Sequence, residues 1–265
     1  MAAQQPDARA HNPNGLDFTR VASYERRIRA DIERVWENVL DWEHLAHLHD
    51  TSFDFIDLID AGSWGWRVHS NEARTATIEL VVADAHSYVS RSYADGAQKA
   101  EIWTFLTPGE GATDIRVEFD LADVPEARRD AYGERMLALY GHLWDEDEAM
   151  MMARTRRLQE SRSRERTVTL GRRGELRLPL TFELGGREYR LREVDGALTA
   201  LPTTCPHLLG PLPEQPAADG TLTCPWHGYR FDVSTGACLW PATATCRLPP
   251  TPAIELDDDL VIARA

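Results

Sequence analysis

Hydrophobic and polar residues alternate at two different spacings, helical and strand-like, along the first two thirds of the chain. Apolar positions recur at helical spacing over 32–40, directly after Asp31, a residue type that favours helix N-caps. An extended segment, 18–30, precedes this helix, and a second, much longer helical pattern runs over 125–159. Six strand patterns, separated by turn signals, lie between the two helices; they span 53–58, 64–69, 75–82, 87–93, 101–106 and 115–121.

This order of elements predicts an α+β domain. A strand, a helix, a meander of strands and a last long helix are expected to form an antiparallel sheet that wraps around that helix. Such a wrap can enclose a cavity for a small molecule. Five aromatic residues on the predicted strands either fill the core or line that cavity; they are Trp64, Trp66, Tyr88, Trp103 and Phe105.

The last hundred residues have a different pattern, with short strands interrupted by Gly and Pro. The predicted strands span 168–170, 175–184, 188–194, 197–201, 237–240 and 254–262. Gly185-Gly186 and Asp195-Gly196 are hairpin turn signals. The charged stretch 158–166 predicts a linker, so we expect a disordered N-terminus over 1–17, one domain over 18–163 and a small all-β domain over 164–265.

Composition excludes several classes of function. The 265 residues carry a formal net charge of -14, which argues against a nucleic-acid partner because such proteins need a basic surface. No apolar run approaches the roughly 20 residues of a membrane span, and the first 15 residues lack the apolar stretch of a secretory signal. We therefore expect a soluble protein without a membrane partner. All four cysteines lie in the last quarter, which favours a reduced, cytoplasmic location and metal or redox chemistry over disulfides.

Two short motifs in the all-β part each combine one thiol with one imidazole. Cys205-x-His207 is followed, after sixteen residues, by Cys224-x2-His227. Two Cys and two His can hold either a zinc ion or a mixed-ligand [2Fe–2S] cluster. Zinc sites more often pair C-x2-C with H-x3–5-H, whereas here the two residue types alternate within each motif. The spacing therefore favours the cluster, with one iron on the two cysteines and the other on the two histidines.

The flanking residues support the cluster. The segments CPHLLGPL and CPWHGYRFDVSTG resemble the Rieske family, and the resemblance extends over 167–265. Respiratory Rieske proteins have an additional cysteine in each loop, where this chain has Gly210 and Trp226. They also place hydroxyl groups near the sulfurs, where this chain has Tyr229 and Phe231. Because fewer hydrogen bonds to the sulfurs lower the potential, the resemblance implies a low-potential domain. The remaining thiols, Cys238 and Cys246, are expected to be ordinary half-buried residues.

A second group of chemistry-bearing residues lies at the end of the first helix. Asn38-x2-Asp41-x2-His44-x4-His49 places two histidines close together, with the chain bending between them. Two His and one carboxylate form the facial triad of non-heme iron(II) sites, which leaves positions open for O2 and substrate. The carboxylate is expected from the long helix, where Asp147 lies on the apolar face. Glu146 and Glu148 compete for this role.

This group resembles the catalytic subunit of Rieske non-heme iron oxygenases, which have N-x2/3-D-x2-H-x4-H followed by an acid in a late helix. The resemblance implies an iron held by His44, His49 and Asp147, and it implies Asp41, as an electron bridge, and Asn38 as catalytic residues. It also implies an external reductase or ferredoxin, O2, a hydrophobic or aromatic substrate and a homo-oligomer, in the family a trimer. Here the two domains stand in reversed order and the catalytic part is shorter.

Two other functions fit the same residues. Helix-grip domains of the SRPBCC/START type, which bind hydrophobic ligands, also resemble this helix through Trp36, Asp41, Trp42 and Leu45. The chain would then be a Rieske electron carrier fused to a ligand-binding module, without a second iron. A zinc-binding interaction protein is the third possibility. The sequence indicates neither the substrate nor whether the reaction is mono-oxygenation, dioxygenation or demethylation.

Overall fold

The computed structural model describes residues 6–8, 17–194 and 196–265. Most of the predicted disordered N-terminus, and Asp195 of the predicted hairpin turn, lie outside these residues. Ala8 is buried beside Val81 and Val89. The chain divides into two compact units, Met1–Thr155 and Arg156–Ala265.

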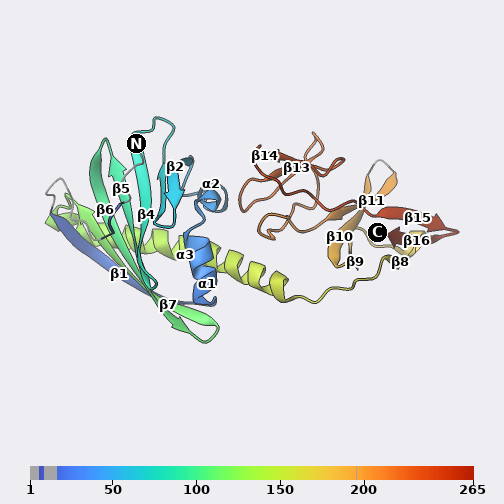
Figure 1. Cartoon of the computed structure of the whole chain (residues 1–265), viewed down its shortest axis with the longest axis horizontal. Helices are drawn as coiled ribbons and strands as arrows, with labels where there is room; N and C mark the ends of the chain where they lie inside the picture. Colours follow the sequence, from blue (N-terminus) through green and yellow to red (C-terminus); the bar gives the residue numbers. More distant parts are fainter. Residues whose placement is uncertain (1–5, 9–16, 195) are drawn as a thin grey trace. The chain divides into compact units, whose positions relative to one another are not determined.

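The first unit contains one seven-stranded antiparallel sheet (Figure 1). The strand order is β1-β7-β6-β5-β4-β3-β2, so that β1, which precedes the first helix, pairs with the last strand of the meander. The strands are β1 (Phe18–Ile28), β2 (Asp57–Gly62), β3 (Gly65–His69), β4 (Ala76–Asp84), β5 (Ser87–Ala94), β6 (Ala97–Gly109) and β7 (Ala112–Ala122).

Helices cover one face of this sheet. After β1 come α1 (Ile32–Val39), the 3-10 turn η1 (Trp42–His44) and α2 (Leu45–Leu48), and after β7 come η2 (Glu126–Arg128) and α3 (Arg129–Gln159). Trp144 and Met151 of α3 share one buried core with Val117 and Phe119 of β7. Gly133 lets the start of α3 approach β1, because a Cβ there would lie 2.6 Å from the Val21 carbonyl oxygen. The predicted α+β helix-grip architecture is confirmed.

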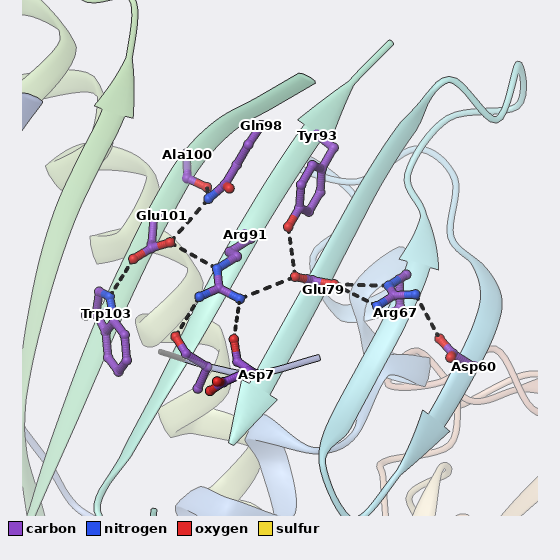
Figure 2. Close-up of polar contacts among 11 residues, drawn as sticks. Asp7, Asp60, Arg67, Glu79, Arg91, Tyr93, Gln98, Ala100, Glu101 and Trp103 are labelled. Carbon is purple, nitrogen blue, oxygen red and sulfur yellow. Dashed lines mark hydrogen bonds and ion pairs between the residues drawn. The ribbon is translucent and has the colours of Figure 1, made fainter. Parts of the chain in front are cut away.

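The opposite face of the sheet holds a network of charged side chains (Figure 2). Arg91 is only 5% exposed; it donates to Glu101 and to the carbonyl oxygens of Asp7 and Ala8. Glu79, 4% exposed, accepts hydrogen bonds from Arg67 and from the Tyr93 hydroxyl. These buried charges are tolerated because each has opposite charges or hydrogen bonds around it.

One predicted strand is shifted in the structure. The strand expected over 53–58 lies instead at Asp57–Gly62. The carbonyl oxygen of His49 accepts hydrogen bonds from the backbone of both Ser52 and Phe53, which holds this segment in a turn after α2. Phe53 packs against the His49 ring instead of entering the sheet.

The second unit contains three small antiparallel sheets, with orders β11-β10-β9, β12-β13-β14 and β15-β16-β8. Its strands are β8 (Thr167–Arg172), β9 (Leu180–Leu184), β10 (Arg187–Val194), β11 (Ala197–Pro202), β12 (Thr221–Thr223), β13 (Arg230–Asp232), β14 (Cys238–Trp240), β15 (Ala253–Asp257) and β16 (Leu260–Arg264); a 3-10 turn, η3 (Arg173–Glu175), follows β8. The all-β prediction is therefore confirmed.

Three details of the second unit differ from the prediction. The single strand expected over 254–262 is the hairpin of β15 and β16, because Asp258 takes a left-handed turn conformation with φ 54°. The strand expected over 175–184 is only β9, which starts directly after Pro179, a residue without a backbone N–H to donate. The strands β12 and β13 were not predicted, because three residues each are too few for a periodic pattern.

Among the described residues, none of the helices combines the length and the apolar character that a bilayer crossing requires.

Candidate functional site

The segment after α1 bends twice, and the two bends aim His44 and His49 at one point. Asp41 ends the first bend, since its Oδ1 accepts a hydrogen bond from the backbone N–H of Glu43 at the start of η1. His44 is the last residue of η1, and His49 follows the single turn of α2. The two rings lie with their centroids 5.0 Å apart at an angle of 73°.

Asp147 of α3 completes this group. Its Oδ1 lies 3.4 Å from Nε2 of His44 and 3.1 Å from Nε2 of His49. One ligand atom from each of the three residues lies within 4.8 Å of the other two, and all three residues are buried. The structure therefore brings together residues that are about a hundred positions apart in the chain.

Polar neighbours hold each side chain of the group in place. The amide of Asn38 donates to Oδ1 of Asp147 at 3.0 Å. The Nδ1 atom of His49 hydrogen-bonds Oε2 of Glu146 at 2.7 Å, and Nδ1 of His44 lies 3.8 Å from Oδ2 of Asp41. Both histidines thus turn Nε2 towards Asp147 and Nδ1 towards a carboxylate. Metal-binding histidines commonly have this arrangement, because the carboxylate fixes the ring and increases its basicity.

The other two acids considered for the triad have different partners. Glu148 is buried, and its two oxygens bind the guanidinium groups of Arg26 and Arg29. Glu146 lies on the far side of His49 from Asp147, as its contact with Nδ1 shows. Of the three acids, Asp147 alone contacts both histidines through Nε2.

The carboxyl group of Asp147 stays ionised although it is buried. Burial by itself would raise the pKa of Asp147, but the hydrogen bond and charge of His49, the charge of His44 and the Asn38 amide lower it. Burial would lower the pKa of His49, but Asp147 and Glu146 outweigh this effect and raise it. A metal ion bound here would therefore displace a proton from the His49 ring. A buried carboxylate that stays ionised beside two imidazoles is the donor set of a non-heme iron(II) site, so the residues fit such a metal.

A cavity of about 710 Å³ opens beside the group. His44, His49 and Asp147 line it together with apolar side chains from the sheet and from α3. Of the five aromatic residues noted in the sequence, Trp66 and Tyr88 line this cavity. Trp103 and Phe105 stack on each other, and Trp64 packs with Trp103 in the cluster around Val81. The cavity has the size and apolar character of a small-molecule site.

The second unit presents its four candidate ligands from two loops with the same backbone geometry. The N–H of Cys205 donates to the carbonyl of Gly210, and that of Cys224 donates to the carbonyl of Tyr229, five residues on in each case. Each cysteine carbonyl accepts from the residue four positions on, Leu209 or Gly228, and both of these residues have a positive φ. The two loops are therefore the same turn, used twice.

These turns bring two thiols and two imidazoles together; Cys205, Cys224 and His227 are buried, and His207 is half-buried. The His207 and His227 ring centroids lie 4.7 Å apart, and Cys205 and Cys224 are each 1% exposed. A hydrogen bond between the two thiols raises the pKa of Cys205 and lowers that of Cys224 to about 5, where His227 also favours the thiolate. Tyr229 stacks on His207, with centroids 4.0 Å apart. Paired thiolates beside paired imidazoles fit a Rieske cluster.

Fold and loops together define a protein of two parts, a helix-grip unit followed by a Rieske unit. Residues 166–252 match the family Rieske [2Fe-2S] domain, as the sequence predicts, and the helix-grip unit precedes it in the predicted order. Residues 166–252 of the second unit are therefore similar to the Rieske [2Fe-2S] domain. The matched range includes the four candidate ligands of such a cluster; they are Cys205, His207, Cys224 and His227.

Known proteins resemble separate parts of the chain. Apoptosis-inducing factor 3 of Mus musculus, like that of Homo sapiens, is 41% identical over 54 residues, which are 20% of this chain and 9% of that protein. The chain thus spans a small part of these curated relatives. Among solved structures, the Zhui aromatase/cyclase of a Streptomyces species is 12% identical over 55% of this chain and 100% of that chain, with a TM-score of 0.41. A reduced oxygenase–ferredoxin complex of carbazole 1,9a-dioxygenase is 18% identical over 39% of this chain and 29% of that chain, with a TM-score of 0.30.

Proposed function

We propose that the protein is a Rieske-type oxygenase that hydroxylates or demethylates a hydrophobic small molecule. The Rieske unit receives electrons from an external reductase or ferredoxin. A ferrous ion held by His44, His49 and Asp147 supplies the activation of O2 when it is bound. The observation that carries this proposal is that two Nε2 atoms and one carboxylate converge at the wall of an apolar cavity.

The residues around the triad have definable tasks. Asn38 and Glu146 hold Asp147 and His49, so that the lone pairs of the three ligands point to one place before any metal binds. The apolar walls place the substrate against this point and keep water away from it. Asp41 has one oxygen engaged with the backbone of η1 and the other near Nδ1 of His44. It is the proposed electron bridge to a cluster-binding histidine of a neighbouring subunit.

Iron content of the whole chain tests the proposal. Protein purified without oxygen should contain three iron atoms, two in the cluster and one in the triad. His44→Ala should contain two and consume no O2, while the EPR spectrum of its reduced cluster should match that of the unchanged protein. His86→Ala is the matched control, because His86 is exposed in the turn after β4 and lies outside the triad; it should keep three iron atoms.

Three results would overturn the oxygenase. Two iron atoms per chain in the unchanged protein, with no increase on adding Fe(II), would leave an electron carrier fused to a ligand-binding module. Equal iron content in His44→Ala and the unchanged protein would remove the triad. A colourless protein without the EPR signal of a mixed Cys/His cluster would support a zinc protein instead.

Asp41 is tested separately. Asp41→Asn should keep three iron atoms and the cluster spectrum, because Asp41 is not a ligand in either site. Electron transfer from the reduced cluster should slow strongly, which stopped-flow absorbance of the cluster measures during single turnover. An unchanged rate would remove the bridge role and leave the two metal sites in place.

A further inference from the structure

The cavity beside the triad has two further charged side chains in its lining, Lys99 and Arg135. Within the described lining, Asp147 is the only carboxylate, and it is engaged with the histidines. Lys99 is also the only lysine in a chain that has 29 residues of the Lys and Arg types. The cavity therefore combines an apolar body with two positive charges that the triad does not use.

Both cations lie at the end of the cavity away from the triad. Ala100, next to Lys99, pairs with Leu121, which in turn pairs with Thr19 near the start of β1. The first turns of α3 contact the same end of β1, since Gly133 packs on the Val21 carbonyl. Arg135 follows two residues later, whereas Asp147 is twelve residues further on, or about 18 Å along the helix axis at 1.5 Å per residue.

A β-bulge turns Lys99 towards the cavity. In the pairing of β5 with β6, Ser92 lies opposite Ala100 and Tyr93 opposite Gln98, so Lys99 is the additional, unpaired residue. Gln98 consequently joins the network on the other face of the sheet, where it donates to Glu101 (Figure 2). Lys99 and Ala100 both line the cavity. Bulges commonly redirect a side chain in this way near binding sites.

These two cations differ from the arginines on the outer face of the sheet. Arg67 and Arg91 there are paired with Glu79 and Glu101. Neither Lys99 nor Arg135 forms an ion pair with a carboxylate of residues 6–8, 17–194 or 196–265. In a chain with a net charge of -14, two such cations at one end of an apolar cavity form a place for an anion.

We propose that the ligand of this cavity is a long apolar carboxylic acid. Its carboxylate lies between Lys99 and Arg135, and its apolar end reaches the triad. This inference rests on the proposed function, since it takes the cavity as the substrate site, but binding of the acid requires neither iron nor O2. Lys99 and Arg135 are then specificity-determining residues, which place the acid so that the carbon atoms farthest from the carboxylate lie at the metal.

Calorimetric titration of the full chain with decanoate and with decan-1-ol tests the proposal without any mutation. Decanoate should bind at least about tenfold more tightly, because hydrogen bonds between charged groups are stronger than hydrogen bonds to a neutral hydroxyl group. Equal affinity for the acid and the alcohol would overturn the proposal. Iron content is measured on the same sample, so that a missing third iron and a missing preference for the acid are separate results.

Variants then locate the carboxylate. Lys99→Gln and Arg135→Gln should each weaken decanoate binding about fivefold, as partly exposed ion pairs do, and leave decan-1-ol unchanged. Arg27→Gln is the control, since Arg27 is 59% exposed on the outer edge of β1 and lies outside the cavity lining; it should change neither affinity. An equal loss for acid and alcohol in both cavity variants, with unchanged circular dichroism, would show that these residues only shape the wall.

Discussion

The two candidate metal sites of this protein each contain two histidines, but their side chains are positioned in opposite ways. In the triad, the side chains are positioned by other side chains: Asn38 fixes Asp147, and Glu146 fixes His49. In the Rieske loops, the backbone does this work, because Cys205 and Cys224 each have their N–H and carbonyl engaged within the same kind of turn. One group depends on distant contacts, the other on local chain geometry.

This difference predicts how each group fails. A triad of separate elements is expected to lose its metal through the removal of one charge while the fold remains. A loop site is expected to tolerate changes of surface charge but not a small addition of volume beside the cluster. The following substitutions test this contrast, from the largest expected effect to the smallest.

Asp147→Asn should have the largest effect. The amide cannot supply the negative charge, and Fe(II) affinity should fall by more than the roughly 10- to 100-fold that the loss of an outer partner costs. Anaerobic Fe(II) titration of protein depleted of its mononuclear iron measures this. Asp145→Asn on the same helix is the control, since Asp145 is 68% exposed and pairs with Arg26. Equal Fe(II) affinity in Asp147→Asn and the control would contradict the assignment.

Gly210→Ala should disturb the Rieske loops. A Cβ at this position would lie 2.7 Å from Sγ of Cys224 and 3.0 Å from the Trp226 ring, and such overpacking costs about 1–3 kcal/mol. We expect a lower cluster content, measured from the visible absorbance per chain. Mononuclear iron should not change. Gly174→Ala, where a Cβ would meet no atom within 4 Å, should keep the full absorbance; an equal loss in both variants would refute the packing argument.

Glu146→Gln should have an intermediate effect on the triad. The amide oxygen can still accept the hydrogen bond from Nδ1 of His49. The negative charge of the carboxylate is lost, however, and with it the increase in basicity that makes His49 a stronger metal ligand. Fe(II) binding should weaken about tenfold, the lower end of the range for an outer partner. Glu134→Gln, on an exposed part of α3, should match the unchanged protein in the same titration. A complete loss of Fe(II) binding in Glu146→Gln would instead indicate that Glu146 is itself a ligand of the metal.

Asp232→Asn should have the smallest effect, and this effect is on the stability of the fold and not on metal binding. Hydrogen bonds from the Ser234 hydroxyl and from the backbone and hydroxyl of Thr235 lower the pKa of Asp232 to about 2. Because the folded pKa lies below the usual value of 3.8, Asp232 stabilises the fold above about pH 4 and loses this effect as the pH falls towards 2. Urea unfolding followed by circular dichroism measures the free energy of unfolding. This free energy should be lower for the variant than for the unchanged protein at pH 7, and the difference should narrow below pH 4. A difference independent of pH would exclude the charge as its cause.

The sequence by itself determined the features that depend on short-range spacing. Both Cys-His motifs could be recognised because their ligands are two or three residues apart, and the family match over 166–252 agrees with them. The helix after Asp31 and the long helix up to Gln159 followed from periodicity, as did most strands of the large sheet. These features are local, and local propensity and amphipathic pattern carry them.

The tertiary structure decided the features that depend on contacts between distant elements. The sequence left three adjacent acids as candidates, and only packing of α3 against α1 and α2 placed Asp147 on Nε2 of both histidines while Glu148 met two arginines. The bulge that places Lys99 in the cavity lining arises from the register of β5 and β6, which no pattern within β6 reveals. A one-residue difference in register or helix rotation changes the face on which a side chain lies, and this difference is settled only when the elements pack together.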